Sequence, residues 1–125
     1  MIKLVFSLKR RPEMTREEFQ AYWRDHHAPL VARNAEALRI RRYVQTHARA
    51  SELAAAQSAA RGSEPDEYDG QAELWWDSFD DVAAVVSTPA GLQAALELLE
   101  DERRFIDLEH SPLWIGEEHE VVPST

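Results

Sequence analysis

His26 is the residue of this sequence best placed to move a proton. It follows Phe19 and Trp23 at the spacing of one helical stripe, so the predicted helix turns its imidazole toward the interior. An imidazole in apolar surroundings titrates near neutral pH and can take and return a proton. We therefore expect His26 to be a catalytic acid or base. The structural alternative is a core histidine that hydrogen-bonds a backbone carbonyl.

The adjacent histidine, His27, has a different expected place. On a helical wheel it points about 100° away from its neighbour. The two rings therefore cannot easily serve one site unless the helix ends between them. We expect His27 to be a structural residue, or to contact substrate at the rim of a pocket.

Two further side chains could complete a proton-transfer site. Tyr43, in a predicted strand, could donate a hydrogen bond to a substrate carbonyl or a developing enolate oxygen, unless it only packs. Glu73 lies between apolar neighbours in another predicted strand, where burial would raise its affinity for a proton. The alternative for Glu73 is an ion pair with Arg39, Arg41 or Arg42 of the adjacent strand.

Aromatic side chains could form the walls of a pocket for a flat, apolar ligand. Candidates for contact with substrate are Phe6, Trp23, Trp75 and Trp76. Aromatic residues at strand and helix spacing also belong to ordinary cores, so this pattern alone does not distinguish a ligand pocket from plain packing.

The sequence lacks the patterns that would hold a metal ion or a cofactor. It has no cysteine and four glycines, and His26 and His27 are adjacent rather than four residues apart as in a helical zinc motif. It contains no nucleophile elbow, phosphate-binding glycine loop or dinucleotide fingerprint. We therefore expect neither a metal nor a cofactor, and NAD, FAD and ATP are disfavoured.

Composition and charge disfavour nucleic acid and membrane as partners. The formal net charge is −9, although residues 1–49 carry eleven Lys or Arg against five Asp or Glu. Nucleic-acid binding depends largely on an excess of cations. No run approaches the roughly 20 apolar residues of a membrane span, and the first residues show no leader pattern. For 125 residues we expect one domain, in the cytoplasm, with a small molecule as its ligand.

Alternating and helical periodicities predict an α+β fold. A strand over residues 2–8 precedes a helix that begins with the capping box Thr15 and Glu18, and Pro29 predicts a break or kink after the two histidines. The remaining predicted elements are a strand at 39–47, a short helix and exposed loop within 50–69, a strand at 71–76, helices at 79–86 and from 90, and a strand at 113–122. This order is the βαββαβ arrangement of ferredoxin-like antiparallel sheets, with an insert after the second strand.

The predicted sheet is apolar on both faces. Val5, Trp75, Trp114 and Val122 lie on the face opposite their neighbours, where a sheet covered by helices on one side would normally be polar. A second copy of the chain could cover this face through a two-fold interface. We therefore expect a homodimer.

The stretch YWRDHHAPLV at residues 22–31 is the most specific part of a wider pattern. The pattern also includes IKLVF at 2–6, TREEF at 15–19, RYVQ at 42–45, DGQAELW at 69–75 and EEH at 117–119. Together these segments resemble the EthD family over nearly the whole chain. The part unlike the family is about 49–68, a variable insert of helix and loop within a single EthD-like domain spanning 1–125.

The resemblance implies a dimeric α/β barrel whose pocket lies between sheet and helices and works without metal or prosthetic group. Members of the family occur beside ether-degrading cytochrome systems and in polyketide tailoring, and relatives isomerise muconolactones. In those isomerising relatives the position of His26 is a histidine that transfers protons, so the resemblance implies that role here. A shared fold does not determine which reaction a protein catalyses.

These observations leave two main functions. The first is a cofactor-independent enzyme, an isomerase, cyclase, dehydratase or oxygenase, which removes a proton next to the carbonyl of a small lactone, aromatic or polyketide-like compound. The second is a non-catalytic binding or accessory protein of an oxygenase or ether-degrading system, which would need the same pocket without a titrating base. Haem binding is a third option, based on fold analogy and the available histidines.

Overall fold

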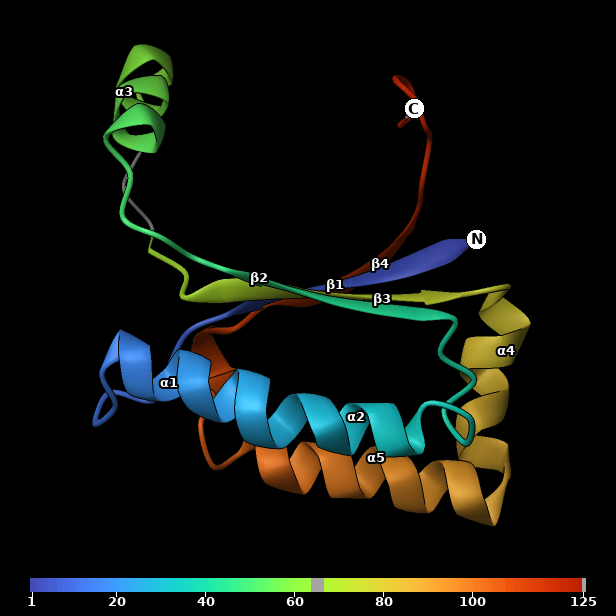
Figure 1. Ribbon diagram of the computed structural model, residues 1–125. Coiled ribbons are helices and arrows are strands. Elements are labelled where there is room, and N and C mark those ends of the chain that lie inside the picture. The colour runs from blue at the N-terminus through green and yellow to red at the C-terminus, as the bar shows by residue number, and fades with distance from the viewer. Residues whose placement is uncertain (64–66, 125) are drawn as a thin grey trace.

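The computed structural model describes residues 1–63 and 67–124, which form a four-stranded antiparallel sheet with helices on one face (Figure 1). The strands are β1 (Ile2–Leu8), β2 (Arg42–His47), β3 (Gly70–Trp76) and β4 (Leu113–Glu117). The helices are α1 (Arg16–Tyr22), α2 (Ala28–Asn34), α3 (Glu52–Arg61), α4 (Phe79–Ala84) and α5 (Pro89–Glu102). The strand order β2-β3-β1-β4 is that of a ferredoxin-like fold and confirms the predicted α+β class.

The helices α1, α2 and α5 cover one face of the sheet, whereas α3 and the chain after β4 rise from the other face, hereafter the open face (Figure 1). Strand register decides which side chains go where. Tyr43 of β2 lies opposite Leu74 of β3, and both point to the helices. Lys3 of β1 lies opposite Trp75, and both point to the open face.

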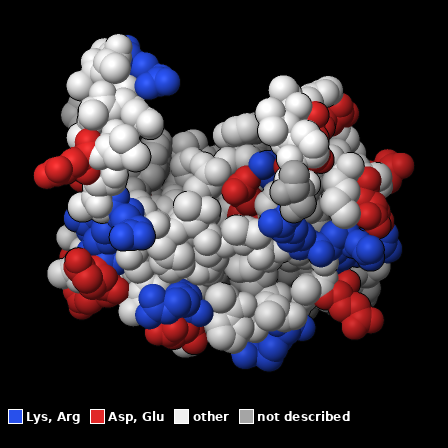
Figure 2. Space-filling model, turned by 45° about the horizontal axis from the view of Figure 1, so that its top comes forward, with Lys and Arg blue, Asp and Glu red and all other residues white. Residues whose placement is uncertain are grey.

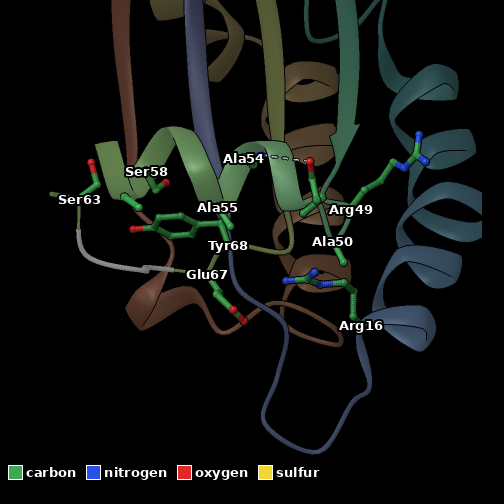
Figure 3. A pocket seen from close by; sticks show the side chains of 12 residues that line it. Arg16, Arg49, Ala50, Ala54, Ala55, Ser58, Ser63, Glu67 and Tyr68 are labelled. Atoms are coloured by element: carbon green, nitrogen blue, oxygen red, sulfur yellow. Dashed lines mark hydrogen bonds between the residues drawn. The ribbon is translucent and has the colours of Figure 1, made fainter. Parts of the chain in front are cut away.

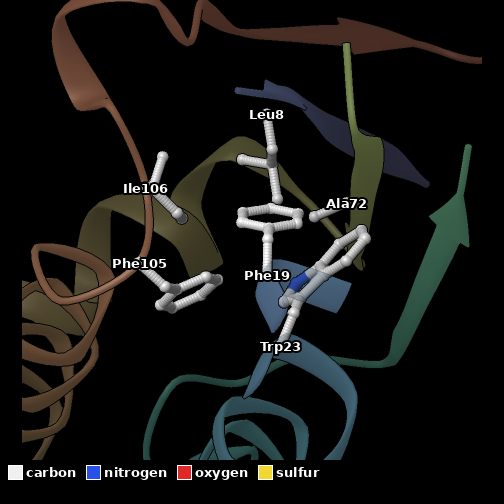
Figure 4. Packing of buried hydrophobic residues seen from close by; sticks show 6 residues of the cluster. All are labelled: Leu8, Phe19, Trp23, Ala72, Phe105 and Ile106. Atoms are coloured by element: carbon white, nitrogen blue, oxygen red, sulfur yellow. The ribbon is translucent and has the colours of Figure 1, made fainter. Parts of the chain in front are cut away.

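The core lies between the sheet and the helices. One cluster contains Leu8, Phe19, Trp23, Ala72, Phe105 and Ile106, and its rings and aliphatic side chains meet in Figure 4. A second contains Leu30, Val31, Leu38, Val85, Ala94 and Leu98. Burial of each large apolar side chain stabilises the fold by roughly 1.5–3 kcal/mol. These clusters fix the helices against the sheet.

A close approach at Gly70 lets the largest core side chain reach the sheet. A Cβ atom at this position would overlap the Trp23 indole and would lie 2.6 Å from the Thr46 carbonyl oxygen. Any other residue would therefore push α1 away from β3 or distort the β2–β3 pair.

Of the break or kink predicted at Pro29, the break does not occur, because the helix widens there instead of ending. The capping box is present: Thr15 accepts from the Glu18 amide at 3.1 Å, and Glu18 accepts from the Thr15 amide at 2.9 Å. A π-helical turn, Trp23–His27, then follows α1, and the Ala28 amide donates to the Trp23 carbonyl five residues earlier. The changed hydrogen-bond pattern accommodates the proline, which lacks an amide hydrogen, and α2 continues to Asn34.

Other elements differ from prediction mainly at their ends. The second strand begins at Arg42 rather than 39, since Arg39 has a φ of 57°. The last strand ends at Glu117 instead of 122. The short helix of the insert is confirmed as α3, while residues 64–66 of its expected loop lie outside the described residues.

Among the described residues, no single helix is long and apolar enough to cross a membrane. The pair Phe79–Ser87 and Pro89–Glu102 reaches that length and hydropathy together, but it is bent by 94°.

Candidate functional site

A small cavity lies between the sheet and the helices, where polar side chains meet apolar walls. Its volume is about 40 Å³, room for roughly three water molecules, so a larger ligand would need side chains to move. The apolar lining comprises Phe6, Leu8, Trp23, Val31, Ala72, Leu74, Leu98 and Ile106, and the polar lining comprises His27, Tyr43 and Glu102. Few polar groups converging in an apolar pocket are typical of small-molecule sites.

His27 is held in one orientation by a buried carboxylate. Its Nδ1 lies 2.7 Å from Oδ2 of Asp101, whose exposed fraction is 1%. An ionised carboxylate only accepts hydrogen bonds, so Nδ1 carries the hydrogen and Nε2 is the basic nitrogen. Burial lowers the pKa of His27, although the hydrogen bond and charge of Asp101 oppose that effect. The neutral imidazole is therefore a base aimed from a fixed position.

Asp101 serves as an acceptor for several side chains at once. Besides His27, it accepts from the Tyr22 hydroxyl at 2.5 Å and from Arg104 at 3.2 Å, and His26 Nδ1 lies 3.5 Å away. Burial alone would raise the pKa of Asp101, but the hydrogen bonds from Tyr22, His27 and Arg104 outweigh it and lower the pKa overall. Asp101 is thus an anion near neutral pH despite its burial.

Glu102 has the opposite character. Burial, together with the charge of Asp101, raises the pKa of Glu102 to about 7. Within the described part of the chain, no side chain donates a hydrogen bond or an ion pair to its carboxyl group, which lines the cavity. A carboxyl group that titrates near neutral pH beside a histidine base can act as an acid or a base itself.

Tyr43 is arranged to donate a hydrogen bond. Its hydroxyl oxygen accepts from Nε2 of Gln45 at 2.9 Å, and the same amide nitrogen donates to the Trp23 carbonyl at 3.0 Å. The hydroxyl hydrogen therefore remains for a group in the cavity. Burial raises the pKa of Tyr43, which keeps the phenol protonated.

The structure exchanges the expected places of the two histidines. His27 is buried, whereas the His26 side chain is 57% exposed and stacks on Tyr22, with ring centroids 4.6 Å apart. The expectation that His26 lies on the buried stripe is wrong because the π-helical turn adds a residue to one turn. With that extra residue, Phe19, Trp23 and His27 face the core at intervals of four. A catalytic role for His26 stays a prediction.

Glu73 and Trp75 lie on the open face, away from the cavity. The Glu73 carboxylate is 2.5 Å from Nζ of Lys3, which is also 3.4 Å from Glu118. An arginine partner for Glu73 was the wrong expectation: β3 lies between β1 and β2, and it is Lys3 of β1 that reaches Glu73. Arg42 instead lies over the Trp75 ring at 4.7 Å, and the Trp75 indole donates to Glu118. A catalytic role for Glu73 and substrate contact by Trp75 remain predictions that this placement does not favour.

The other expected contact residues divide between cavity and core. Phe6 and Trp23 line the cavity beside His27 and Tyr43. Trp76 is buried elsewhere, where its indole donates to the Leu38 carbonyl at 2.7 Å. The substrate contacts themselves stay predictions.

Sequence reasoning missed Asp101 and Glu102, which occur in the charged run ELLEDE and resemble a solvated helix end. One signal could have found them. They continue the buried stripe of α5 by falling three and four residues after Leu98 and before buried Phe105. Within the described residues, no group of three or more histidine, cysteine, aspartate or glutamate side chains is arranged to hold a metal ion.

Comparison with known families identifies the family of the chain. Residues 11–109 match the EthD domain. This chain belongs to the EthD family. No curated protein sequence matches it.

Solved structures share the fold at low sequence identity. An EthD family protein from Bacillus halodurans has 20% identity and a TM-score of 0.61, with 95% of this chain and 100% of that chain covered. A dimeric, ferredoxin-like protein of unknown function from Bacteroides fragilis has 14% identity and a TM-score of 0.58, covering 94% and 95%. SnoaB, a cofactor-independent oxygenase from Streptomyces nogalater, has 15% identity and a TM-score of 0.57, covering 98% and 97%.

Proposed function

We propose that this EthD family protein is a cofactor-independent enzyme that moves protons on a small, largely apolar carbonyl compound. The observation that carries the proposal is the His27–Asp101 pair, which places a histidine base on a cavity also lined by Tyr43 and Glu102. Isomerisation, cyclisation, dehydration and oxygenation of such compounds can all begin with removal of a proton next to the carbonyl.

In the proposed first step, Nε2 of His27 takes that proton. The electron pair of the broken C–H bond forms a carbon–carbon double bond, and the carbonyl π pair moves to oxygen as an enolate. The Tyr43 hydroxyl donates a hydrogen bond to this oxygen, which stabilises charge that develops only as the reaction proceeds. Asp101 stabilises the imidazolium that forms, as a carboxylate does in other histidine-based sites.

Glu102 supplies a second proton carrier in the same mechanism. With its pKa at about 7, both of its forms are present near neutral pH. Where the substrate carries a further double bond, the enolate is a dienolate, and protonated Glu102 can deliver a proton to its far carbon while His27 keeps the first proton. Transfer of that proton from His27 to Glu102 through solvent then restores both groups and completes an isomerisation. An uncharged substrate suits this cavity, because a neutral Glu102 does not repel it. An anionic substrate would instead be repelled by the negative charge of Asp101 nearby.

A homodimer is part of the proposal. The open face carries Trp114, which is 58% exposed, and a second copy would cover it. Two neighbours of the same fold support the proposal by analogy. The Bacteroides protein is described as dimeric, which supports the homodimer, and SnoaB is described as a cofactor-independent oxygenase, which supports an enzyme without cofactor.

The test is hydrogen exchange at carbon. Cyclic ketones, unsaturated lactones and aromatic ketones are incubated in deuterated buffer, and proton NMR follows the loss of the signal next to each carbonyl. We expect the wild type to accelerate exchange in one class and His27→Gln to lose at least about 100-fold of that rate. His110→Gln, at an exposed histidine, is the matched control and should keep it.

Two other outcomes would change the proposal. If His26→Gln abolishes exchange and His27→Gln does not, the outer histidine is the base. If compounds raise the melting temperature of the wild type but no exchange occurs, the protein binds without catalysis and the accessory function replaces the enzyme.

A further inference from the structure

Helix α3 is specified by the sequence but is not buried by any of the residues that the structure describes. Ser51 caps its start by accepting from the Ala54 amide at 3.2 Å, and Gly62 ends it in the left-handed conformation with a φ of 65°. All ten of its residues are exposed. A helix this short is marginal in water unless it packs against something. Its capping and its exposure together indicate a partner outside the chain.

A groove beneath α3 has room for an extended peptide. Its volume is about 610 Å³, and small side chains of the helix, including Ala55 and Ala59, form its roof. Tyr68, Glu67 and Arg16 lie below them in Figure 3, so the floor combines an aromatic ring with charges of both signs. Arg16 is already paired with Asp69 at 3.0 Å, whereas Arg49, which also lines the groove, has no such ion pair among the described residues. These features suit a narrow apolar segment whose negative charge can meet Arg49.

The chain contains such a segment after β4. Val121 and Val122 are 87% and 84% exposed, and Glu120 precedes them. Glu118 anchors the start of this tail through Trp75 and Lys3 of the open face. In Figure 1 the tail and α3 rise on the same side of the sheet but at opposite ends, so the tail of one chain does not reach its own groove.

A two-fold dimer through the open face would bring the two together. Figure 2 shows this face as a hollow between two raised ends, with acidic and basic side chains together near its middle and uncharged ones around them. A two-fold axis along the line of sight of Figure 1 places a second copy upside down on the hollow, with its tail beside the first α3. The same contact then occurs again at the other end, as an isologous interface requires.

We propose that α3 clasps the C-terminal tail of a second copy of this chain, so that residues 119–124 of each subunit lie in the partner's groove. The valines would pack against the alanines of α3, and Glu120 would face Arg49 of the groove. The clasp rests on the homodimer of the proposed function, and it gives the insert at 49–68 a role: it holds the dimer from both ends.

The absence of cysteine from the sequence allows a direct test. Ala55→Cys is placed in one tagged copy and Val121→Cys in a differently tagged copy, and the two are coexpressed and mildly oxidised. Ala59→Cys and Val122→Cys extend the scan, since a disulfide needs Cα atoms about 4.4–6.8 Å apart. We expect a disulfide between the two tags that a reducing agent breaks. Leu92→Cys, exposed on α5, replaces the tail cysteine in the control and should not cross-link.

Three outcomes separate the clasp from the other proposals. Cross-linking above the Leu92→Cys control supports it. A dimer in light scattering whose four cysteine pairs do not cross-link above the control overturns the clasp and leaves the dimer. A 14.3 kDa monomer at tens of micromolar overturns dimer and clasp together. The exchange assay for catalysis is independent of all three.

Discussion

On the helix-covered face of the sheet, ionisable side chains are buried or partly buried beside a cavity, whereas on the open face an ion pair lies at the surface of the sheet. His27, Asp101 and Glu102 belong to the covered side, and Lys3 and Glu73 to the open one. Burial changes the pKa of each of the first three. Acidic and basic residues alone therefore do not mark a reactive site, since reactivity needs low-polarity surroundings, which within a single chain the helix-covered face provides.

The largest expected effect compares one carboxylate from each face. Asp101→Asn should reduce the proposed exchange activity by about 10³-fold, because an amide no longer holds the His27 tautomer or stabilises the imidazolium. Glu73→Gln removes the same charge from the open face and should leave the rate within about twofold. The pH dependence of the rate should also change in Asp101→Asn, which a merely structural role would not produce. If Asp101→Asn and Glu73→Gln lowered the exchange rate equally, the two faces would not differ in their contribution to catalysis.

A second comparison uses two tryptophans and measures stability. Trp23→Ala removes a core side chain that contacts both the sheet and α1, so the free energy of unfolding should fall by about 3–5 kcal/mol. Trp114→Ala, on the open face, should cost less than about 1 kcal/mol in a monomer at low concentration. Urea unfolding at several protein concentrations checks both. A loss for Trp114→Ala that grows with concentration would reveal burial of that ring by a second copy.

The smallest expected effect is a pH dependence of stability that comes from Glu102. Between pH 4.5 and about 7 the folded protein keeps the Glu102 proton, while the unfolded chain has lost it. The free energy of unfolding should therefore fall as pH rises through this range, by at most about 3 kcal/mol. Glu102→Gln should remove that fall, and Glu97→Gln, on the exposed side of α5, should retain it. Identical pH profiles for all three proteins would show that Glu102 is an ordinary carboxyl group.

The sequence predicted the fold better than the site. Alternation and the capping box of Thr15 and Glu18 locate β1 and α1 correctly, because these signals depend on neighbouring residues. Tyr43, chosen for its hydroxyl, lies on the helix-covered face of its strand, although the alternation did not say which face the helices cover. The pairing of Glu73 with Lys3 was not predicted, because the ferredoxin-like strand order gives β3 two neighbours, β1 and β2, and only the register decides which cation Glu73 meets.

The histidine that faces the cavity could not be read from an ideal helical wheel. Such a wheel assumes 3.6 residues per turn throughout, and the π-helical turn Trp23–His27 departs from that number. Asp101 and Glu102 were hidden for another reason. The burial of Asp101 and the partial burial of Glu102 depend on α5 packing against the π-helical turn and α2, a contact between segments far apart in the chain.

The π-helical turn can also be understood as a single inserted residue. Deleting one residue between Trp23 and His27 would return the segment to the ordinary helical repeat, so one histidine of the pair would be lost or would change sides. If the turn instead became α-helical with no residue deleted, the helix beyond it, with Leu30 and Val31 in the second core cluster, would rotate by about 100°. The length of this turn thus links two properties that a substitution would treat separately: which imidazole meets the cavity, and how α2 docks on the sheet.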